Sequence, residues 1–228
     1  RAAGQVLRRY RPDVLFFTGG YVAAPVALAG RRLPALLYVP DVEPGLALKT
    51  LARFADRIAV SAEASRPYFA PRANVVVTGY PVRRELTRWE RPAALQALGL
   101  AEDLPVLLVF GGSKGARSIN RALLANLAGL LDEMQVVHVT GALDWPEVEQ
   151  RRMQIAAELA AGGRGERMQR YHAYAYLHEE MGAAFAAADL VVCRAGASTL
   201  GELPAFGLPA ILVPYPYAWR YQRVNAEH

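Results

Sequence analysis

The 228-residue sequence contains one cysteine, Cys193, so no disulfide can form within the chain and no thiolate cluster can hold a metal. The four histidines show no metal-ligand spacing, and no Asp-x-Asp pair occurs. No apolar run reaches the roughly 18 residues that a transmembrane helix needs, and no signal peptide pattern opens the chain. We therefore expect a reducing compartment, no metal and no cofactor.

Hydrophobic residues make up 53% of the chain, which is enough for a large core and argues against disorder. The net charge of +5 comes almost entirely from arginine and favours an anionic partner, either a nucleic acid or a membrane surface. No nucleic-acid-binding signature accompanies these arginines, so we expect no nucleic acid partner. For any single arginine cluster, a solvated helix face is the simpler interpretation.

Short apolar runs alternate with helical patterns, which predicts an α/β fold with parallel sheets. In the first half, we expect strands at 14–18, 36–39, 57–60 and 75–77 and helices at 3–11, 23–31 and 46–54. In the second half, we expect strands at 106–110, 135–140, 168–171, 190–193 and 210–213 and helices at 118–131, 145–161, 179–187 and 198–205. These patterns predict two Rossmann-like domains, at 1–88 and 105–228, joined by a linker at 89–104.

Two glycine-rich turns run from apolar strands into helices, at 111–116 and at 194–202. Each places bare backbone N–H groups and small hydroxyls at a helix N-terminus, where a phosphate can bind. The first turn has neither the Walker spacing nor the G-x-G-x-x-G fingerprint, so a routine strand-to-helix turn remains an alternative for it. Cys193 ends a buried strand with no histidine placed by sequence to activate it, so we reject a cysteine nucleophile.

In the second turn, Ser198 is an N-cap candidate and Glu202 lies one helical turn further on. A carboxylate there suits the vicinal hydroxyls of a ribose because it accepts two hydrogen bonds at once. A capping role is the alternative, although a capping box places the acid three residues after the cap. Gln222 and Asn225 share a helical face and are candidates for binding sugar hydroxyls. A structural role at the start of a surface helix is the alternative for Asn225.

Five blocks, taken in order, resemble the MurG family: Thr18-Gly19-Gly20-Tyr21-Val22, Gly79-Tyr80-Pro81-Val82-Arg83, Gly-Gly-Ser-Lys-Gly-Ala at 111–116, residues 192–203, and Gly207-Leu208-Pro209-Ala210. Members of that family are GT-B glycosyltransferases that transfer N-acetylglucosamine (GlcNAc) from UDP-GlcNAc to lipid I, making lipid II of peptidoglycan. The resemblance implies two Rossmann-like domains facing a cleft. It assigns 1–88 to an incomplete acceptor and membrane-side domain and 105–228 to a truncated UDP-sugar donor-binding domain.

The resemblance also implies a set of site residues. The donor would be held by Arg83, Ser113, Leu177, His178, Ala197, Ser198, Thr199, Leu200, Gly201, Glu202 and Gln222. Further possible donor contacts are Gly112, Lys114, Asp41 and Asn225, and Gly19, Gly20 and Tyr21 would lie on the acceptor side. The family's proposed catalytic base lies on a glycine-rich loop upstream of residue 1, so the catalytic residue is unknown and we expect this fragment alone to be inactive.

The implied reaction is an inverting single displacement, in which Arg83, Ser113 and the helix N-termini stabilise the leaving diphosphate without a metal ion. The implied partners are UDP-GlcNAc, undecaprenyl-linked lipid I and the anionic inner leaflet. The implied location is the cytoplasmic face of the bacterial plasma membrane, as a peripheral protein.

The sequence departs from the family at three places. Tyr38-Val39-Pro40-Asp41 stands where the family has His-Glu-Gln-Asn, Tyr80 stands for Asn, and Lys114 stands for Gln. Three alternatives therefore stay open: a related GT-B glycosyltransferase with a different lipid acceptor, such as a diacylglycerol; a UDP-GlcNAc 2-epimerase, which the block at 113–116 disfavours; and a non-catalytic UDP-sugar-binding module.

Overall fold

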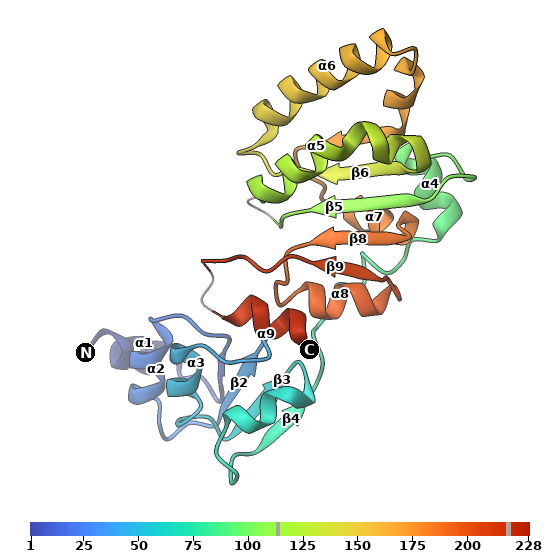
Figure 1. Ribbon diagram of the computed structural model, residues 1–228. Helices are drawn as coiled ribbons and strands as arrows, with labels where there is room; N and C mark the ends of the chain where they lie inside the picture. The colour runs from blue at the N-terminus through green and yellow to red at the C-terminus, as the bar shows by residue number, and fades with distance from the viewer. Residues whose placement is uncertain (113–114, 218–219) are drawn as a thin grey trace. The chain divides into compact units, whose positions relative to one another are not determined.

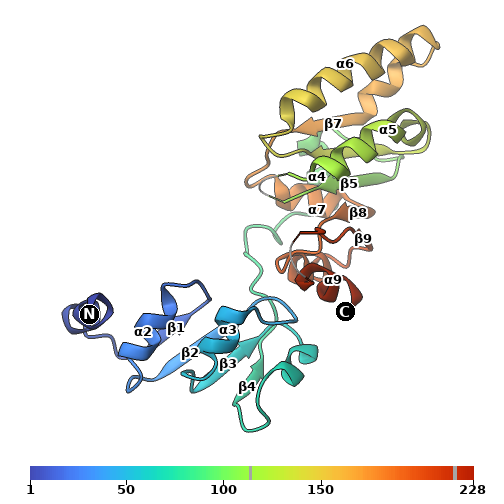
Figure 2. The ribbon, with the colours of Figure 1, turned by 60° about the vertical axis from the view of Figure 1, so that its left-hand side comes forward.

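The computed structural model describes residues 1–112, 115–217 and 220–228. The chain forms two compact units, whose elements are drawn in Figures 1 and 2. Unit 1 comprises Arg1–Pro81, Gly196–Gly201 and Tyr215–His228, and unit 2 comprises Val82–Ala195 and Glu202–Pro214. The chain thus passes from unit 1 to unit 2, returns to unit 1 at Gly196–Gly201, enters unit 2 again at Glu202–Pro214 and ends in unit 1.

Unit 1 is built on a four-stranded parallel sheet of order β1-β2-β3-β4. Its elements are α1 (Ala2–Tyr10), β1 (Leu15–Phe17), α2 (Ala23–Ala29), β2 (Ala35–Val39), α3 (Leu46–Leu51), β3 (Arg57–Val60), the 3-10 helix η1 (Glu63–Tyr68), β4 (Val75–Val77) and α9 (Tyr221–Glu227). Alternate strand residues point to one face, where Leu37, Val39, Ile58 and Val60 form the core with Leu48 and Leu51 of α3.

Unit 2 is built on a five-stranded parallel sheet of order β7-β6-β5-β8-β9. Its elements are α4 (Arg91–Leu98), β5 (Val106–Phe110), α5 (Arg117–Glu133), β6 (Gln135–Val139), α6 (Trp145–Ala161), the 3-10 helix η2 (Gly165–Arg170), β7 (Tyr171–Tyr174), α7 (Met181–Ala187), β8 (Leu190–Cys193) and β9 (Ala210–Leu212). Helix α8 (Thr199–Ala205) begins in unit 1 and ends in unit 2.

Both faces of the unit 2 sheet are covered, which explains why its central strands read as continuous apolar runs. On one face, Leu108 of β5 belongs to a core cluster with α4 and α7. On the other face, Val109 belongs to a cluster with α5 and α6. Figure 1 shows α5 and α6 on the same side of this sheet. Among the described residues, no helix is both long and apolar enough to cross a membrane.

The α/β fold predicted from the sequence is confirmed, but the strand predicted at 168–171 is wrong. Residues 165–170 form η2, and the strand occupies Tyr171–Tyr174 instead. Arg170 explains the difference, because its guanidinium donates to the carbonyl oxygens of Leu131 and Asp132 at 3.0 and 3.3 Å. These bonds fasten the segment to the end of α5, where its backbone turns rather than extends.

Two segments also pack differently from the predicted domain limits. The predicted linker contains α4, whose Ala94, Leu95 and Leu98 are part of the unit 2 core. Residues 215–228 were placed with the second domain, but by their contacts they belong to unit 1.

Candidate functional site

The two glycine-rich turns leave neighbouring strands of the unit 2 sheet at the same edge. Phe110, the last residue of β5, pairs in register with Cys193, the last residue of β8. The sheet order reverses between these strands, because the chain runs outward from β5 through β6 to β7 and then crosses to β8 and β9. Open α/β sheets bind ligands in the crevice at the carboxyl ends of strands flanking such a switch point.

The first turn is closely packed against the backbone around it. A Cβ on Gly111 would collide with the backbone nitrogen of Ala116, and a Cβ on Gly115, whose φ is +77°, would collide with the carbonyl oxygen of Thr140. The N–H of Gly115 donates to the oxygen of Gly112 at 2.9 Å. Because of these collisions, only glycine fits at 111 and 115. The predicted contacts Ser113 and Lys114 lie outside the described residues.

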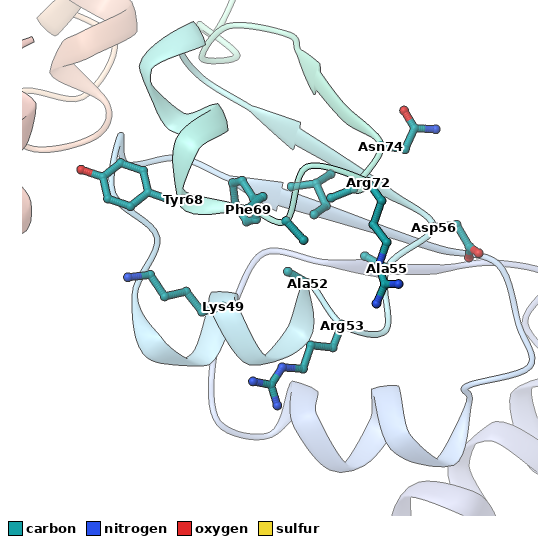
Figure 3. A pocket seen from close by; sticks show the side chains of 12 residues that line it. Lys49, Ala52, Arg53, Ala55, Asp56, Tyr68, Phe69, Arg72 and Asn74 are labelled. Carbon is teal, nitrogen blue, oxygen red and sulfur yellow. The ribbon is translucent and has the colours of Figure 1, made fainter.

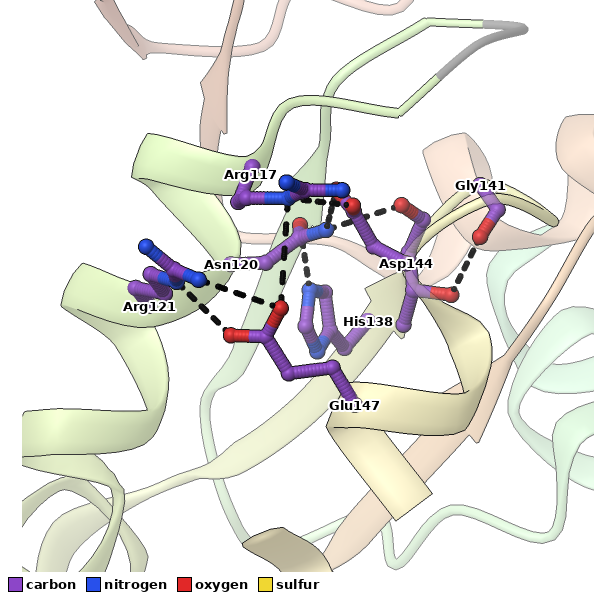
Figure 4. Close-up of polar contacts among 8 residues, drawn as sticks. Arg117, Asn120, Arg121, His138, Gly141, Asp144 and Glu147 are labelled. Carbon is purple, nitrogen blue, oxygen red and sulfur yellow. Dashed lines mark hydrogen bonds and ion pairs between the residues drawn. The ribbon is translucent and has the colours of Figure 1, made fainter. Parts of the chain in front are cut away.

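A buried polar network lies beneath this turn, between α5, β6 and the start of α6 (Figure 4). The Asn120 amide donates to the Thr140 carbonyl at 2.9 Å and to Asp144 at 3.0 Å. Its oxygen lies 3.0 Å from Nε2 of His138, whose Nδ1 lies 2.8 Å from the Tyr171 hydroxyl. His138 is fully buried, and burial lowers its pKa to about 3. The imidazole is therefore neutral at physiological pH.

Arg194, the first residue after β8, joins the ends of three segments. Its guanidinium donates to the carbonyl oxygens of Val213 and Pro214, both at 3.2 Å, and to the hydroxyl of Ser118 at 2.9 Å. These bonds fasten the exit of β8 to the exit of β9 and to the first turn of α5. The sequence motif contains Arg194, but nothing in the motif indicated this role.

Arg83 and Glu202, both predicted donor contacts, lie within electrostatic reach of each other in unit 2. Burial raises the pKa of the Glu202 carboxyl, and the positive charge of Arg83 opposes that rise. Cys193 is completely buried, and burial together with Glu202 raises its pKa to about 12. The thiol is therefore protonated at physiological pH, which agrees with the rejection of a cysteine nucleophile.

Leu177 and His178, both predicted donor contacts, differ in exposure. The Leu177 side chain is buried in the unit 2 core. His178 is exposed, and its ring lies 4.6 Å from the ring of Tyr176.

The predicted donor residues Ala197–Gly201 belong to unit 1. Thr199 is buried, and its hydroxyl donates to the oxygen of Gly196 at 2.6 Å, which tightens the turn before α8. A Cβ on Gly201 would collide with the side chain of Tyr80, so glycine permits close packing there. Ala197, Ser198 and Leu200 are partly exposed.

Three further candidates are engaged in contacts within unit 1. Asn225 accepts from the Val42 N–H at 3.1 Å and donates to Asp41 at 2.8 Å. The oxygen of Gln222 accepts from the Tyr215 N–H at 2.8 Å. Asn225 is 1% exposed and these bonds hold the loop after β2, while its sugar-binding role stays a prediction. Asp41 contacts the same buried side chain.

Beside this contact, the buried carboxylate of Glu43 accepts from Arg220 at 2.5 and 3.0 Å and from Lys49 at 3.3 Å. The hydrogen bond from Arg220 is the main cause that lowers the pKa of Glu43. These ion pairs fasten the start of α9 to the loop after β2, in the region where the sequence departs from the family's His-Glu-Gln-Asn.

The acceptor-side candidates follow β1. Gly19 and Gly20 have φ angles of +117° and +88°, which glycine adopts without strain, and the Tyr21 side chain is 92% exposed. Unit 1 also carries a hollow of about 820 Å³ whose lining includes Lys49, Arg53 and Arg72 (Figure 3). Among the described residues, no group of three or more His, Cys, Asp or Glu side chains is placed to hold a metal ion.

The chain is similar to known proteins in sequence and in fold. The sequence profile described as "Glycosyltransferase family 28 C-terminal domain" matches residues 106–228. A UDP-N-acetylglucosamine--N-acetylmuramyl-(pentapeptide) pyrophosphoryl-undecaprenol N-acetylglucosamine transferase from Roseiflexus sp. is 42% identical over all of this chain and 57% of its own length. A protein of the same name from Desulforamulus reducens is 40% identical over 96% of this chain and 58% of its own length.

Among solved structures, MurG of Acinetobacter baumannii matches with a TM-score of 0.72 and 25% identity, covering 99% of this chain and 59% of that chain. A putative UDP-N-acetylglucosamine 2-epimerase from Listeria monocytogenes matches with a TM-score of 0.66 and 14% identity, covering 99% and 67%. The second match shows the fold alone. The chain spans less than two thirds of the length of the curated relatives described above.

Proposed function

The chain belongs to glycosyltransferase family 28, and from this membership we propose that it forms part of an enzyme that transfers GlcNAc from UDP-GlcNAc to undecaprenyl-linked lipid I. In this proposal Arg83, Glu202 and the strand exits of unit 2 bind the UDP-sugar donor, and Gly19, Gly20 and Tyr21 of unit 1 lie on the acceptor side. The product is lipid II, and the protein acts as a peripheral protein at the cytoplasmic face of the plasma membrane.

The observation that carries the proposal is the pairing of Phe110 with Cys193. This register brings the exits of β5 and β8, each followed by a glycine-rich turn, to the same edge of the unit 2 sheet. In this proposal, backbone N–H groups at these exits bind a diphosphate. Arg83 in the same unit adds a full positive charge. Negative charge builds up on UDP as the glycosidic bond breaks, and these groups are fixed in advance to stabilise it. The proposed reaction therefore needs no metal ion and no cofactor.

Glu202 is the proposed ligand of the ribose. Its carboxylate accepts two hydrogen bonds from vicinal hydroxyls when it is ionised, and Arg83 favours that ionised form. The raised pKa implies that acid weakens ribose binding at a higher pH than for an ordinary glutamate.

For unit 1, we propose that Gly19, Gly20 and Tyr21 lie on the acceptor side, since they follow a strand exit and Tyr21 is exposed. The hollow containing Lys49, Arg53 and Arg72 carries positive charge suited to an anionic membrane surface. Binding to anionic vesicles that falls as salt is raised would support this placement, whereas equal binding to neutral vesicles would contradict it.

The donor is tested by titrating the chain calorimetrically with UDP-GlcNAc, UDP-glucose and UDP without added metal. Tighter binding of UDP-GlcNAc than of UDP-glucose is expected. Absence of UDP binding, or equal affinity for both sugars, contradicts the proposed donor.

Glu202→Gln tests the role of the carboxylate. Hydrogen bonds to a charged group contribute about 1.5–3 kcal/mol, so UDP affinity should fall by roughly 10- to 100-fold. The variant should also lose most of the preference of the wild-type chain for UDP over its 2′-deoxy analogue. Glu102→Gln is the matched control, because Glu102 is exposed and precedes β5 at the opposite edge of the sheet. If Glu202→Gln keeps the full preference for UDP over its 2′-deoxy analogue, Glu202 does not bind the ribose.

A further inference from the structure

Only one orientation of the Asn120 side-chain amide forms hydrogen bonds of the correct polarity with all of the neighbours described here. Two of them, the carbonyl of Thr140 and the carboxylate of Asp144, only accept hydrogen bonds, so the Asn120 amide nitrogen must face both. Its oxygen must then face His138, which fixes the imidazole proton on Nε2 and leaves Nδ1 to accept from the Tyr171 hydroxyl. The polarity of the whole network is therefore determined, and a rotated Asn120 amide would leave buried acceptors unpaired.

Asn120 cannot touch a ligand, because it is 2% exposed. It instead holds the Thr140 carbonyl, against which Gly115 packs so closely that a Cβ would collide with it. The position of this carbonyl determines where the end of the glycine turn lies. The Asp144 carboxylate also accepts a hydrogen bond from the guanidinium of Arg117, the first residue of α5, at 2.9 Å.

The same contacts fix the direction of α5. Its N-cap is Ala116, which has no side-chain oxygen to bind the first N–H groups of the helix. Asn120 and Arg117, both in the first helical turns, join α5 to the loop after β6. The first N–H groups of α5 and the glycine turn are thus held by one network.

We propose that Asn120, oriented by His138 and Asp144, is the positioning residue that holds Gly115, at the end of the first glycine-rich turn, and the start of α5 in the geometry that receives the diphosphate of the donor. This inference rests on the proposed function. It assigns to Asn120 an effect on phosphates alone, because the network lies under the turn and contacts no other predicted donor residue among those described.

The test compares UDP, uridine and inorganic pyrophosphate in calorimetric titrations of the full chain. Asn120→Ala should raise the Kd of UDP and of pyrophosphate at least tenfold and change the Kd of uridine less than twofold. Asp144→Asn keeps the size of the side chain and an accepting oxygen, and should raise the Kd of UDP about threefold. If Asn120→Ala does not fold, Asp144→Asn is the variant that tests the proposal.

Leu127→Ala is the matched control for loss of stability. Leu127 is fully buried on the same helix, two turns beyond Asn120, so its truncation destabilises α5 without touching the turn. It should lower the melting temperature and leave the UDP affinity unchanged. Amide hydrogen exchange at Gly111, Gly112, Gly115 and Ala116 should speed up in Asn120→Ala and not in Leu127→Ala.

The outcomes separate the two proposals. If the wild-type chain binds uridine but neither UDP nor pyrophosphate, the proposed function is wrong and the positioning role falls with it. If wild-type binds UDP and a folded Asn120→Ala binds UDP equally well, only the positioning role is wrong. Equal weakening of UDP and uridine in Asn120→Ala also overturns it, because the effect would then be general.

Discussion

Two asparagines in this chain are almost completely buried, and they serve different purposes. Asn120 in unit 2 joins elements close in sequence and holds the Thr140 carbonyl, against which Gly115 of the first glycine-rich turn packs. Asn225 in unit 1 joins α9 to Asp41 and Val42, more than 180 positions earlier in the chain. The first supports a candidate site, and the second holds a distant segment in place. Burial alone does not distinguish them; the partners do.

The difference in stability between unit 1 and unit 2 should be largest at acid pH. The pKa of His138 falls from its ordinary 6.5 to about 3 on folding, so below pH 6.5 the unfolded chain binds a proton that the folded chain does not. Stability of unit 2 is then lost as the pH falls from 6.5 toward about 3. His172, whose pKa burial also lowers, acts in the same direction.

In unit 1 the pKa of Glu43 is lowered instead, so its contribution is present above pH 4.5 and is lost only as the pH falls further. Segment-resolved hydrogen exchange between pH 7 and 4 should show unit 2 losing protection first. His138→Gln should reduce that loss, because its amide can replace both hydrogen bonds without titrating. Earlier loss of protection in unit 1 would contradict the comparison.

A smaller and more local effect is expected from Asn225→Ala. The change leaves the buried Val42 N–H unpaired, which costs about 1–3 kcal/mol. Hydrogen exchange should speed up at Val42 and along α9, while protection of β5 and β6 stays as in the wild-type chain. Gln222→Ala is the control on the same helix, since Gln222 is only partly buried. Equal loosening of β5 and β6 would show that Asn225 supports more than α9.

The smallest effect is expected at the exposed edge of the unit 2 network. Arg121 and Glu147 form an ion pair with an N–O distance of 2.7 Å, yet both side chains are exposed to solvent. Figure 4 marks this pair with dashed lines. Solvent screens such pairs, so Arg121→Ala should leave both the melting temperature and the UDP affinity unchanged within error. A measurable rise in the Kd of UDP would extend the positioning network to the helix surface.

The sequence predicted the fold well because apolar runs and glycine turns are local signals. The MurG family resemblance is confirmed by the comparisons, and the strands Val106–Phe110 and Leu190–Cys193 lie where their apolar runs predicted. The strand predicted at 168–171 failed because the bonds of Arg170 to the end of α5 depend on packing, which no local pattern encodes.

The candidate site was only partly predictable, for the same reason. Glu202 and Arg83 stand in recognisable motifs, and their roles remain predictions. The sequence predicts Asn225 as a ligand of sugar hydroxyls because it lies one helical turn from Gln222. In the structure its side chain forms hydrogen bonds with Val42 and Asp41. No sequence pattern indicates the contact between Asn120 and His138, because the two residues lie on different elements. They come into contact only when β6 packs against α5.

The return of α9 to unit 1 has a consequence for synthesis on the ribosome. Val42 and Asn225, which share a buried hydrogen bond, are 183 positions apart, so translation at about 5–20 residues per second separates their emergence by roughly 10–40 s. During that interval the nascent first unit exposes the Val42 amide and the Glu43 carboxylate to water. Its maturation therefore waits for the whole second unit to be translated.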